Sequence, residues 1–361
     1  MSAQPHHPVG SPGGTRTTSG RVADRDTTML RLAVDRALRG PEVDPNPRVG
    51  AVIVAADGQV AGAGHHRGAG SPHAEVVALR QAGDLAAGGT AYVSLEPCAH
   101  HGRTPPCTTA LTDAGIARLV YAVADPDPRA AGGAQLLAEK GVEVQHLAMP
   151  EATEVLRHWT FAVAQDRPFV TWKTATTLDG RVAAADGSSA WITSSQARED
   201  VHDLRARCGA IVVGTGTALA DDPSLTARLP DGTLRDQQPL RVVVGERELG
   251  DTAQLRDDAA PTVHLTDRDP RSVLSELHTR CIRRVLLEGG PTLAAAWWRA
   301  GVVDEVVAYL APALLGTGPG AVADLGITTM AGIARLHIDD VTRVGPDVRI
   351  TAHPVRAQEE E

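Results

Sequence analysis

The sequence predicts an α/β protein built from two domains. Its 361 residues exceed the length of most single domains, and 42% hydrophobic with 22% charged residues is typical of a globular chain. Apolar runs of strand length alternate with helical patterns in both halves. The two halves carry different motifs and no internal repeat. No apolar run approaches the ~20 residues of a membrane span, so we expect no membrane partner.

The charge balance favours a small substrate. Thirty-five basic and 44 acidic residues give a net charge of −9 and a pI near 5.9. A protein that neutralises a nucleic-acid backbone usually carries a basic excess. We therefore expect a small-molecule substrate and no nucleic-acid partner. We also expect a homo-oligomer, whose size the sequence leaves open.

The N-terminal stretch, residues 1–26, is rich in Pro, Gly, Ser, Thr and His and lacks the apolar segment of a signal peptide. It is predicted to be a disordered tail. Two of the four cysteines, Cys208 and Cys281, fall outside any motif. With no secretion signal, we expect both to be reduced and the protein to be cytoplasmic.

The first domain is expected to span residues 27–148. A helical face runs from Leu30 to Leu38 and ends at Gly40-Pro41. Another helix is expected to begin at Ser71-Pro72, with His73 and Glu75 in its first turn. The further elements are strands at 49–54, 91–95 and 119–123, and helices at 107–114 and 135–140. Cys107 would start its helix, where the dipole lowers the pKa of a thiol.

A helical connector is expected at 149–167, followed by a second domain at 168–355. The predicted strands of that domain are 169–174, 210–213, 241–244, 263–265, 285–287, 305–310 and 348–351. Its predicted helices are 196–207, 272–278 and 293–300. This alternation indicates a second α/β layered domain.

Three side chains of the first half have the composition of a catalytic zinc site. His73, Cys98 and Cys107 offer one imidazole and two thiolates, which leaves a fourth zinc position for water. Glu75 is not needed as a ligand and is available to move protons, an arrangement typical of zinc-dependent nucleobase deaminases. The alternatives are ordinary packing for the cysteines and histidine and, for Glu75, a carboxylate that only meets the helix dipole.

Eight residues, 99–106, separate the two cysteines, and His100, His101 and Arg103 lie among them. Extra zinc ligation would close the water position. The other two possibilities are contacts to an anionic substrate group, which suit arginine, and a solvated loop. Asn46, before the strand at 49–54, is expected either to read a pyrimidine edge with its amide or to form an Asx turn.

Glycines follow two apolar strands of the second half. Gly214 and Gly216 would let backbone approach a ligand, but a lone Gly-x-Gly matches no full dinucleotide fingerprint. The segment Glu288-Gly289-Gly290-Pro291-Thr292 joins a strand to a helix. Backbone N–H groups there would bind a phosphate; the alternative is a tight left-handed turn.

Taken together, these motifs resemble the bifunctional deaminase–reductases of riboflavin biosynthesis, the RibD family. The deaminase resemblance lies in Asn46-Pro47-Arg48-Val49-Gly50, in Pro72-His73-Ala74-Glu75, and in the run from Leu95 to Cys107 with its His-His-Gly-Arg-Thr-Pro-Pro filler. The reductase resemblance lies in Leu178-Asp179-Gly180-Arg181, Trp191-Ile192-Thr193-Ser194, the run from Ala220 to Thr226, and Glu288 to Thr292.

The resemblance implies a cytidine-deaminase-like α/β/α domain followed by a dihydrofolate-reductase-like α/β domain, with Zn²⁺ and NADPH as cofactors. The implied cofactor contacts are Ala175, Trp191, Thr217 and Asp221, with the cofactor phosphates at Gly290, Pro291, Thr292, Leu293, Ala294, Ala295 and Ala296. The implied substrate contacts are Ser189, Arg205, Leu225, Arg228 and Glu288. Arg205 and Arg228 are suited to clamp a phosphate.

One position departs from the family pattern. Gly245-Glu246 follows the strand at 241–244, where the family tends to have Asp-Ser. Glu246 would repel the ribose phosphate that the serine meets, which weakens the expected preference for NADPH over NADH.

The implied function is deamination of a diaminohydroxyphosphoribosylaminopyrimidine, then NADPH-dependent reduction of its ribosyl group to ribityl. Lys173 and Asp221 are candidates for assisting proton movement in the reduction. The alternatives are a deaminase of another nucleotide, a zinc-stabilised binding protein without catalysis, and a nucleic-acid editor.

Overall fold

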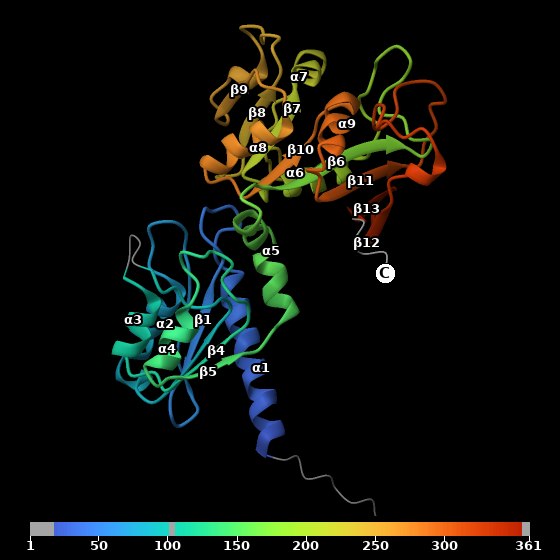
Figure 1. Ribbon diagram of the computed structural model, residues 1–361. Helices are drawn as coiled ribbons and strands as arrows, with labels where there is room; N and C mark the ends of the chain where they lie inside the picture. Colours follow the sequence, from blue (N-terminus) through green and yellow to red (C-terminus); the bar gives the residue numbers. More distant parts are fainter. Residues whose placement is uncertain (1–17, 101–104, 356–361) are drawn as a thin grey trace, which may run out of the picture. The chain divides into compact units, whose positions relative to one another are not determined.

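The computed structural model describes residues 18–100 and 105–355 (Figure 1). These residues form two compact units. The first contains the described residues up to Gly40, then Val49–His66 and Pro72–Glu154, and the second contains Pro41–Arg48, Arg67–Ser71 and Val155 onward. None of the described helices is both long and apolar enough to cross a membrane.

The first unit is built on a five-stranded sheet of order β2-β1-β3-β4-β5. Its strands are β1 (Gly50–Val54), β2 (Val60–His65), β3 (Thr90–Val93), β4 (Arg118–Tyr121) and β5 (Glu143–His146). Strand β1 runs antiparallel to β2 and β3, while β3, β4 and β5 are parallel. Its helices are α1 (Thr18–Ala37), α2 (Ala74–Ala82), α3 (Cys107–Asp113) and α4 (Gly133–Glu139), with a 3-10 turn η1 at Gly83–Ala86.

Helices α1 and α2 cover opposite faces of this sheet, and glycines admit both (Figure 1). A Cβ on Gly50 of β1 would lie 1.9 Å from the Ala33 carbonyl of α1, and a Cβ on Gly64 of β2 would lie 2.5 Å from the Ala74 carbonyl of α2. Gly64 pairs with Ala51, the neighbour of Gly50, and successive residues of a strand point to opposite faces. The layers are therefore α/β/α, as expected, with α2 held against β2.

Three elements of this unit, α1, β2 and β5, differ from the expectation. Helix α1 begins at Thr18, inside the stretch that the sequence predicts to be a tail, and residues 1–17 lie outside the described part of the chain. The reason is a long-range contact: the buried Asp26 receives two hydrogen bonds from Arg118 of β4 and one from the Tyr92 hydroxyl of β3. Strands β2 and β5 were not expected.

The second unit is built on an eight-stranded sheet of order β12-β13-β11-β6-β10-β7-β8-β9. Its strands are β6 (Phe169–Thr177), β7 (Ala210–Gly214), β8 (Leu240–Val244), β9 (Thr262–Leu265), β10 (Arg284–Leu287), β11 (Glu305–Ala311), β12 (Leu336–Val344) and β13 (Asp347–Pro354). The six from β11 to β9 are parallel, and β13 and β12 continue the sheet in antiparallel fashion.

The helices of the second unit are α6 (Ser195–Ala206), α7 (Thr215–Asp221), α8 (Pro270–Thr279) and α9 (Pro291–Arg299). Successive residues of the central strands point to opposite faces of the sheet, so the core has two parts, one on each face. Val212 and Leu287 pack with Trp297 of α9 and Leu274 of α8, while Ile211 and Leu286 pack with Ala218 of α7. The parallel strands are therefore buried on both faces, which explains their continuous apolar runs. Helix α7 and edge strand β12 were not expected.

The expected connector is the helix α5 (Pro150–Ala164), and the division between the units falls within it. The loop Pro41–Arg48, expected in the first domain, groups with the second unit. The Pro45 carbonyl accepts hydrogen bonds from the Trp159 indole and from Arg283 Nε, each at 3.2 Å. The unit to which this loop belongs is decided by contacts with residues far away in the sequence, which a local sequence pattern does not reveal.

Candidate functional sites

Three elements of the first unit bring His73, Cys98 and Cys107 together. His73 caps α2, Cys107 is the first residue of α3, and Cys98 lies in the loop after β3. The His73 Nδ1 atom is 3.1 Å from Cys107 Sγ and 3.6 Å from Cys98 Sγ. All three donor atoms lie within 4.8 Å of one another. One nitrogen and two sulfurs facing a common point fit a zinc ion with an open position.

The loop that carries Cys98 is held by buried backbone contacts. The carboxylate of Glu96, which is 8% exposed, accepts hydrogen bonds from the backbone N–H groups of Asp125, Gly132 and Ala134. A Cβ on Gly133 would lie 1.7 Å from the Pro97 carbonyl oxygen. The start of α4 therefore packs directly on the residue before Cys98. Sequence analysis missed Glu96 and Gly133; the acidic residue next to Pro97-Cys98 was the available signal.

Hydrogen bonding within the cluster shifts the pKa values of the two thiols in opposite directions. The pKa of Cys98 falls to about 4, chiefly because the Cys107 thiol donates to its sulfur. The pKa of Cys107 rises because of the same hydrogen bond and because of burial. Cys107 is the first residue of α3, as expected. A helix dipole alone would lower the pKa of a thiol there, but the hydrogen bond to Cys98 and burial act in the opposite direction. The pKa of His73 is raised by its hydrogen bond to Cys98.

Glu75 lies one residue into α2 and is 3% exposed. Burial raises the pKa of its carboxyl, and the charge of His73 opposes that shift. It also hydrogen-bonds to the Cys107 thiol. A buried carboxyl beside three metal donors, but not one of them, is placed to exchange protons with a molecule bound in the cluster.

The other predicted residues of the first half lie elsewhere. The Asn46 N–H donates to Asp44 Oδ1 at 2.9 Å, so the Asx turn here is made by Asp44. Asn46 itself belongs to the loop that groups with the second unit. Residues 101–104, which include His101 and Arg103, lie outside the described residues, and His100 is exposed.

In the second unit, a hydrogen bond joins the segments that follow the neighbouring strands β7 and β10. The Gly290 N–H donates to Thr217 Oγ1 at 3.2 Å. Gly290 caps α9 with φ −65° and ψ 177°, so the alternative of a left-handed turn is wrong. A Cβ on Gly289 would lie 2.4 Å from Leu293 Cδ2, which accounts for the glycine there.

The predicted phosphate segment 290–296 is not uniformly accessible. Ala294 and Ala295 are buried in the core. Pro291, Thr292, Leu293 and Ala296 keep partial or full exposure. Any anion at this turn would therefore meet the first residues of the segment.

Two predicted substrate residues form an ion pair. Arg205 of α6 donates from Nε and Nη2 to the two carboxylate oxygens of Glu288 at 2.6 and 2.8 Å, and from Nη1 to the Thr226 carbonyl at 3.2 Å. Burial would raise the pKa of Glu288, but the charge and hydrogen bonds of Arg205 lower it to about 2. Burial lowers the pKa of Lys173 on β6, opposed by the charge of Glu288.

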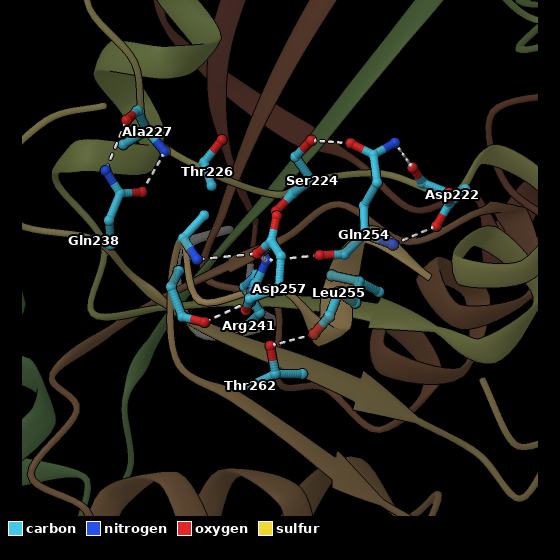
Figure 2. Close-up of polar contacts among 12 residues, drawn as sticks. Asp222, Ser224, Thr226, Ala227, Gln238, Arg241, Gln254, Leu255, Asp257 and Thr262 are labelled. Atoms are coloured by element: carbon cyan, nitrogen blue, oxygen red, sulfur yellow. Dashed lines mark hydrogen bonds and ion pairs between the residues drawn. The ribbon is translucent and has the colours of Figure 1, made fainter. Parts of the chain in front are cut away.

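The loop after α7 carries the next predicted residues, and Figure 2 shows how it is held. Arg241 at the start of β8, which is fully buried, donates to the carbonyls of Ser224 and Gln254, to Asp257 Oδ1, and to the carbonyls of Asp257 and Ala260. The Gln254 amide donates to the Asp222 carbonyl. Sequence analysis missed Arg241, because an arginine is usually a surface charge.

Leu225 of this loop has φ +48° and is buried in the core, while Arg228 donates to Thr226 Oγ1 and to the Gly232 carbonyl. Asp221 is the last residue of α7, and burial raises its pKa. The remaining predicted residues are Ala175 on β6, Ser189 in the following loop, and Trp191, which is 76% exposed with Arg198 over its ring.

Comparison with known proteins settles the family. A model described as the RibD C-terminal domain matches residues 168–350, and one described as the cytidine and deoxycytidylate deaminase zinc-binding region matches residues 23–123. A Mycobacterium tuberculosis protein named riboflavin biosynthesis protein RibD is 51% identical over 309 residues, which cover 85% of this chain and 91% of that one. The chain belongs to the RibD family.

Further RibD proteins agree over nearly their whole length. The Escherichia coli relative is 40% identical, covering 90% of this chain and 98% of its own. A solved Acinetobacter baumannii RibD structure is 37% identical with a TM-score of 0.83, covering 92% of this chain and 99% of that one. A Thermotoga maritima structure, titled as a diaminohydroxyphosphoribosylaminopyrimidine deaminase and 5-amino-6-(5-phosphoribosylamino)uracil reductase, has 30% identity and a TM-score of 0.82 over the same share of each chain.

The RibD relationship confirms the expected fold classes of both domains and the expected function. The chain is a bifunctional deaminase and reductase of riboflavin biosynthesis. Its domains imply Zn²⁺ for the deaminase and NADPH for the reductase, and the donor set His73, Cys98 and Cys107 fits the zinc.

Proposed function

We propose that His73, Cys98 and Cys107 hold the zinc ion and that Glu75 moves the protons of the deamination. The observation that carries this proposal is the cluster of three donors within 4.8 Å beside a carboxyl that is 3% exposed. Zinc, when bound, supplies Lewis-acid activation of a water. The substrate is a diaminohydroxyphosphoribosylaminopyrimidine, whose ring amino group leaves as ammonia.

Glu75 takes a proton from the attacking water on a carboxylate oxygen. It delivers this proton to the ring nitrogen, then takes the second proton from the hydroxyl now on the ring carbon and passes it to the departing amine. Its burial excludes bulk water from these transfers, so each proton stays with the reacting groups. The sum is water added, ammonia lost and a ring carbonyl formed.

The second domain reduces the ribosyl group of the deaminated product to ribityl, which gives 5-amino-6-(5-phosphoribitylamino)uracil. NADPH, when bound, supplies a hydride. We assign its pyrophosphate to the turn at Gly290, where Thr217 fixes the backbone at 3.2 Å. The remaining cofactor contacts are Ala175, Trp191, Asp221 and the residues from Pro291 to Ala296.

Arg205, Arg228, Glu288, Leu225 and Ser189 form the proposed site for the phosphorylated sugar. Arg205 remains bound to Glu288 and keeps its charge there. Lys173 lies within electrostatic range of Glu288 and Arg205 and has a lowered pKa, so it is a candidate to give a proton to the sugar oxygen or nitrogen. Asn46 is a candidate to read the pyrimidine edge.

Both half-reactions measured on one purified chain test this assignment. Ammonia release should need bound zinc, and NADPH oxidation on the deaminated product should not. Zinc removal by a chelator is therefore expected to abolish the first and spare the second. Loss of both activities, or of neither, would contradict the division of labour between the domains.

We also propose that the protein is a homo-oligomer that assembles through the second unit. Strand β12 is the end strand of the eight-stranded sheet, and Leu336, Ile338 and Val341 on it are 42%, 54% and 60% exposed. An exposed apolar edge strand is a pairing surface. Ile338→Asp is expected to lower the mass measured by light scattering to that of one chain. An unchanged mass would reject β12 as the interface.

No nucleic-acid partner is proposed, given the net charge of −9; salt-sensitive binding to single-stranded RNA would contradict this. We assign the protein to the cytoplasm because none of its four cysteines forms a disulfide bond, which is usual in a reducing compartment.

A further inference from the structure

Three charged residues lie where two parallel strands end. Glu246 and Arg247 follow β8, and Arg268 follows the neighbouring β9. Arg268 Nη2 and Glu246 Oε1 form an ion pair at 3.0 Å. A Cβ on Gly216, just beyond β7, would lie 3.2 Å from Arg247 Nη2, so the Arg247 guanidinium lies against the backbone of the next strand end.

The two arginines differ in their partners. Arg268 is ion-paired with Glu246, and the two side chains are 65% and 71% exposed. The Arg247 side chain is exposed, and its guanidinium makes no hydrogen bond or ion pair with any part of the chain that the structure describes. A lone exposed guanidinium at a strand end is a ready phosphate ligand, because its donors match a phosphate in pairs.

Strand ends of this kind decide which dinucleotide a protein accepts. In open α/β sheets the ligand lies across the carboxyl ends of the strands. An acidic residue there binds the ribose hydroxyls of NADH, and an arginine accommodates the 2′-phosphate of NADPH. Glu246 alone favours NADH, while Arg247 favours NADPH.

The strand order places these residues beside the proposed pyrophosphate position. Thr217 and Gly290 join the ends of β7 and β10, and β8 is the next strand beyond β7. Neighbouring strands are ~4.8 Å apart. A dinucleotide with its pyrophosphate at Gly290 and its adenosine half on the β7 side would have its ribose near the end of β8.

We propose that Arg247 binds the 2′-phosphate of NADPH and that Arg268 neutralises Glu246, which would otherwise repel this phosphate. The two arginines together let the chain select NADPH over NADH although Gly245-Glu246 stands where the family tends to have Asp-Ser. A side chain at Gly216 would crowd the Arg247 guanidinium in this position, since its Cβ would lie 3.2 Å from Nη2. This inference rests on the proposed position of the pyrophosphate at Gly290.

Cofactor titrations of the full-length zinc-loaded protein test the role of Arg247. NADPH and NADH are titrated separately, with nicotinamide fluorescence as the readout. Arg247→Gln should weaken NADPH binding about tenfold or more, the loss typical of one charged hydrogen-bonding partner, and leave NADH within about twofold. Arg247→Lys should keep part of the affinity, since it retains the charge without the paired donors.

The matched control is Arg280→Gln, which removes an arginine paired with Glu276 at the far end of α8. It should change neither affinity. Unchanged NADPH binding in Arg247→Gln, or an equal loss for both cofactors, would overturn the proposal.

A double-mutant cycle tests the pair. Arg268→Gln should weaken NADPH binding several-fold, and adding Glu246→Gln should restore it, since no repelling carboxylate is then left. Failure of the second change to restore affinity would reject the neutralising role. If the unchanged protein deaminates but binds no NADPH, the reductase assignment itself fails; if it binds NADPH with an affinity insensitive to Arg247, only this inference fails.

Discussion

The guanidinium of Arg205 and the carboxylate of Glu288 form a two-pronged ion pair across 83 residues of sequence, with N–O distances of 2.6 and 2.8 Å. The two side chains are 16% and 6% exposed. Because water reaches these two side chains poorly, each charge is compensated mainly by the other. A substrate phosphate that binds Arg205 must share it with Glu288, so this pair sets the orientation of the guanidinium before substrate arrives.

Glu288→Gln is expected to destabilise the second unit by about 2–3 kcal/mol, because Arg205 keeps a buried charge without its counter-ion. All five tryptophans lie in the second unit, so tryptophan fluorescence during urea unfolding reports on that unit. The matched control is Glu276→Gln, in an exposed pair with Arg280, which should cost under ~1 kcal/mol. Equal effects of the two changes would contradict the buried role.

The same pair predicts a pH dependence. The pKa of Glu288 falls from an ordinary 4.5 to about 2 in the fold. A depressed carboxyl pKa contributes stability above the unfolded pKa, and that contribution is lost as pH falls toward the folded pKa. The stability difference between the unchanged protein and Glu288→Gln should therefore be constant above about pH 5.5 and shrink between there and pH 2. A difference that grows on acidification would show the opposite sign.

Glu75→Gln should keep zinc and lose ammonia release by a factor of roughly 10² to 10⁴, the usual contribution of general acid–base catalysis. Metal analysis and an ammonia assay on the same sample measure both. Glu139→Gln, on the exposed face of α4, is the control and should change neither. Undiminished ammonia release in Glu75→Gln would remove the carboxyl from the reaction.

Gly133→Ala should reduce zinc content without touching a ligand. Its Cβ would lie 1.7 Å from the Pro97 carbonyl oxygen, so the loop that ends in Cys98 must move. A displacement of a metal ligand or its support typically costs 10- to 100-fold in affinity. Gly250→Ala, where a Cβ would meet nothing within 4 Å, is the control. Full zinc retention in Gly133→Ala would show that the loop adapts.

Arg241→Met should destabilise the second unit by about 3 kcal/mol, because the fully buried guanidinium donates five hydrogen bonds that methionine cannot make. The carbonyls of Ser224, Gln254 and Ala260 all accept hydrogen bonds from this one guanidinium (Figure 2). The urea midpoint followed by tryptophan fluorescence measures the loss. Asp257, half-exposed at 47%, provides the comparison: Asp257→Asn should cost much less. A reversed order would assign the stability to the ion pair instead.

The sequence by itself determined the parts of this protein that depend on short-range pattern. The three candidate zinc donors follow from residue type and spacing near two helix starts. The parallel strands of the second unit follow from continuous apolar runs. Strand β2, with glycines at 62 and 64, was missed because glycine is a poor strand former, yet those glycines let α2 lie on the sheet.

Only the tertiary structure decided the contacts between distant segments. The pairing of Arg205 with Glu288, the burial of Arg241 and the placement of Arg247 against Gly216 all join residues far apart in the chain. A charged residue has the same local pattern whether it is solvated or buried. Its environment is set by which strands become neighbours, and that order is a property of the packed sheet.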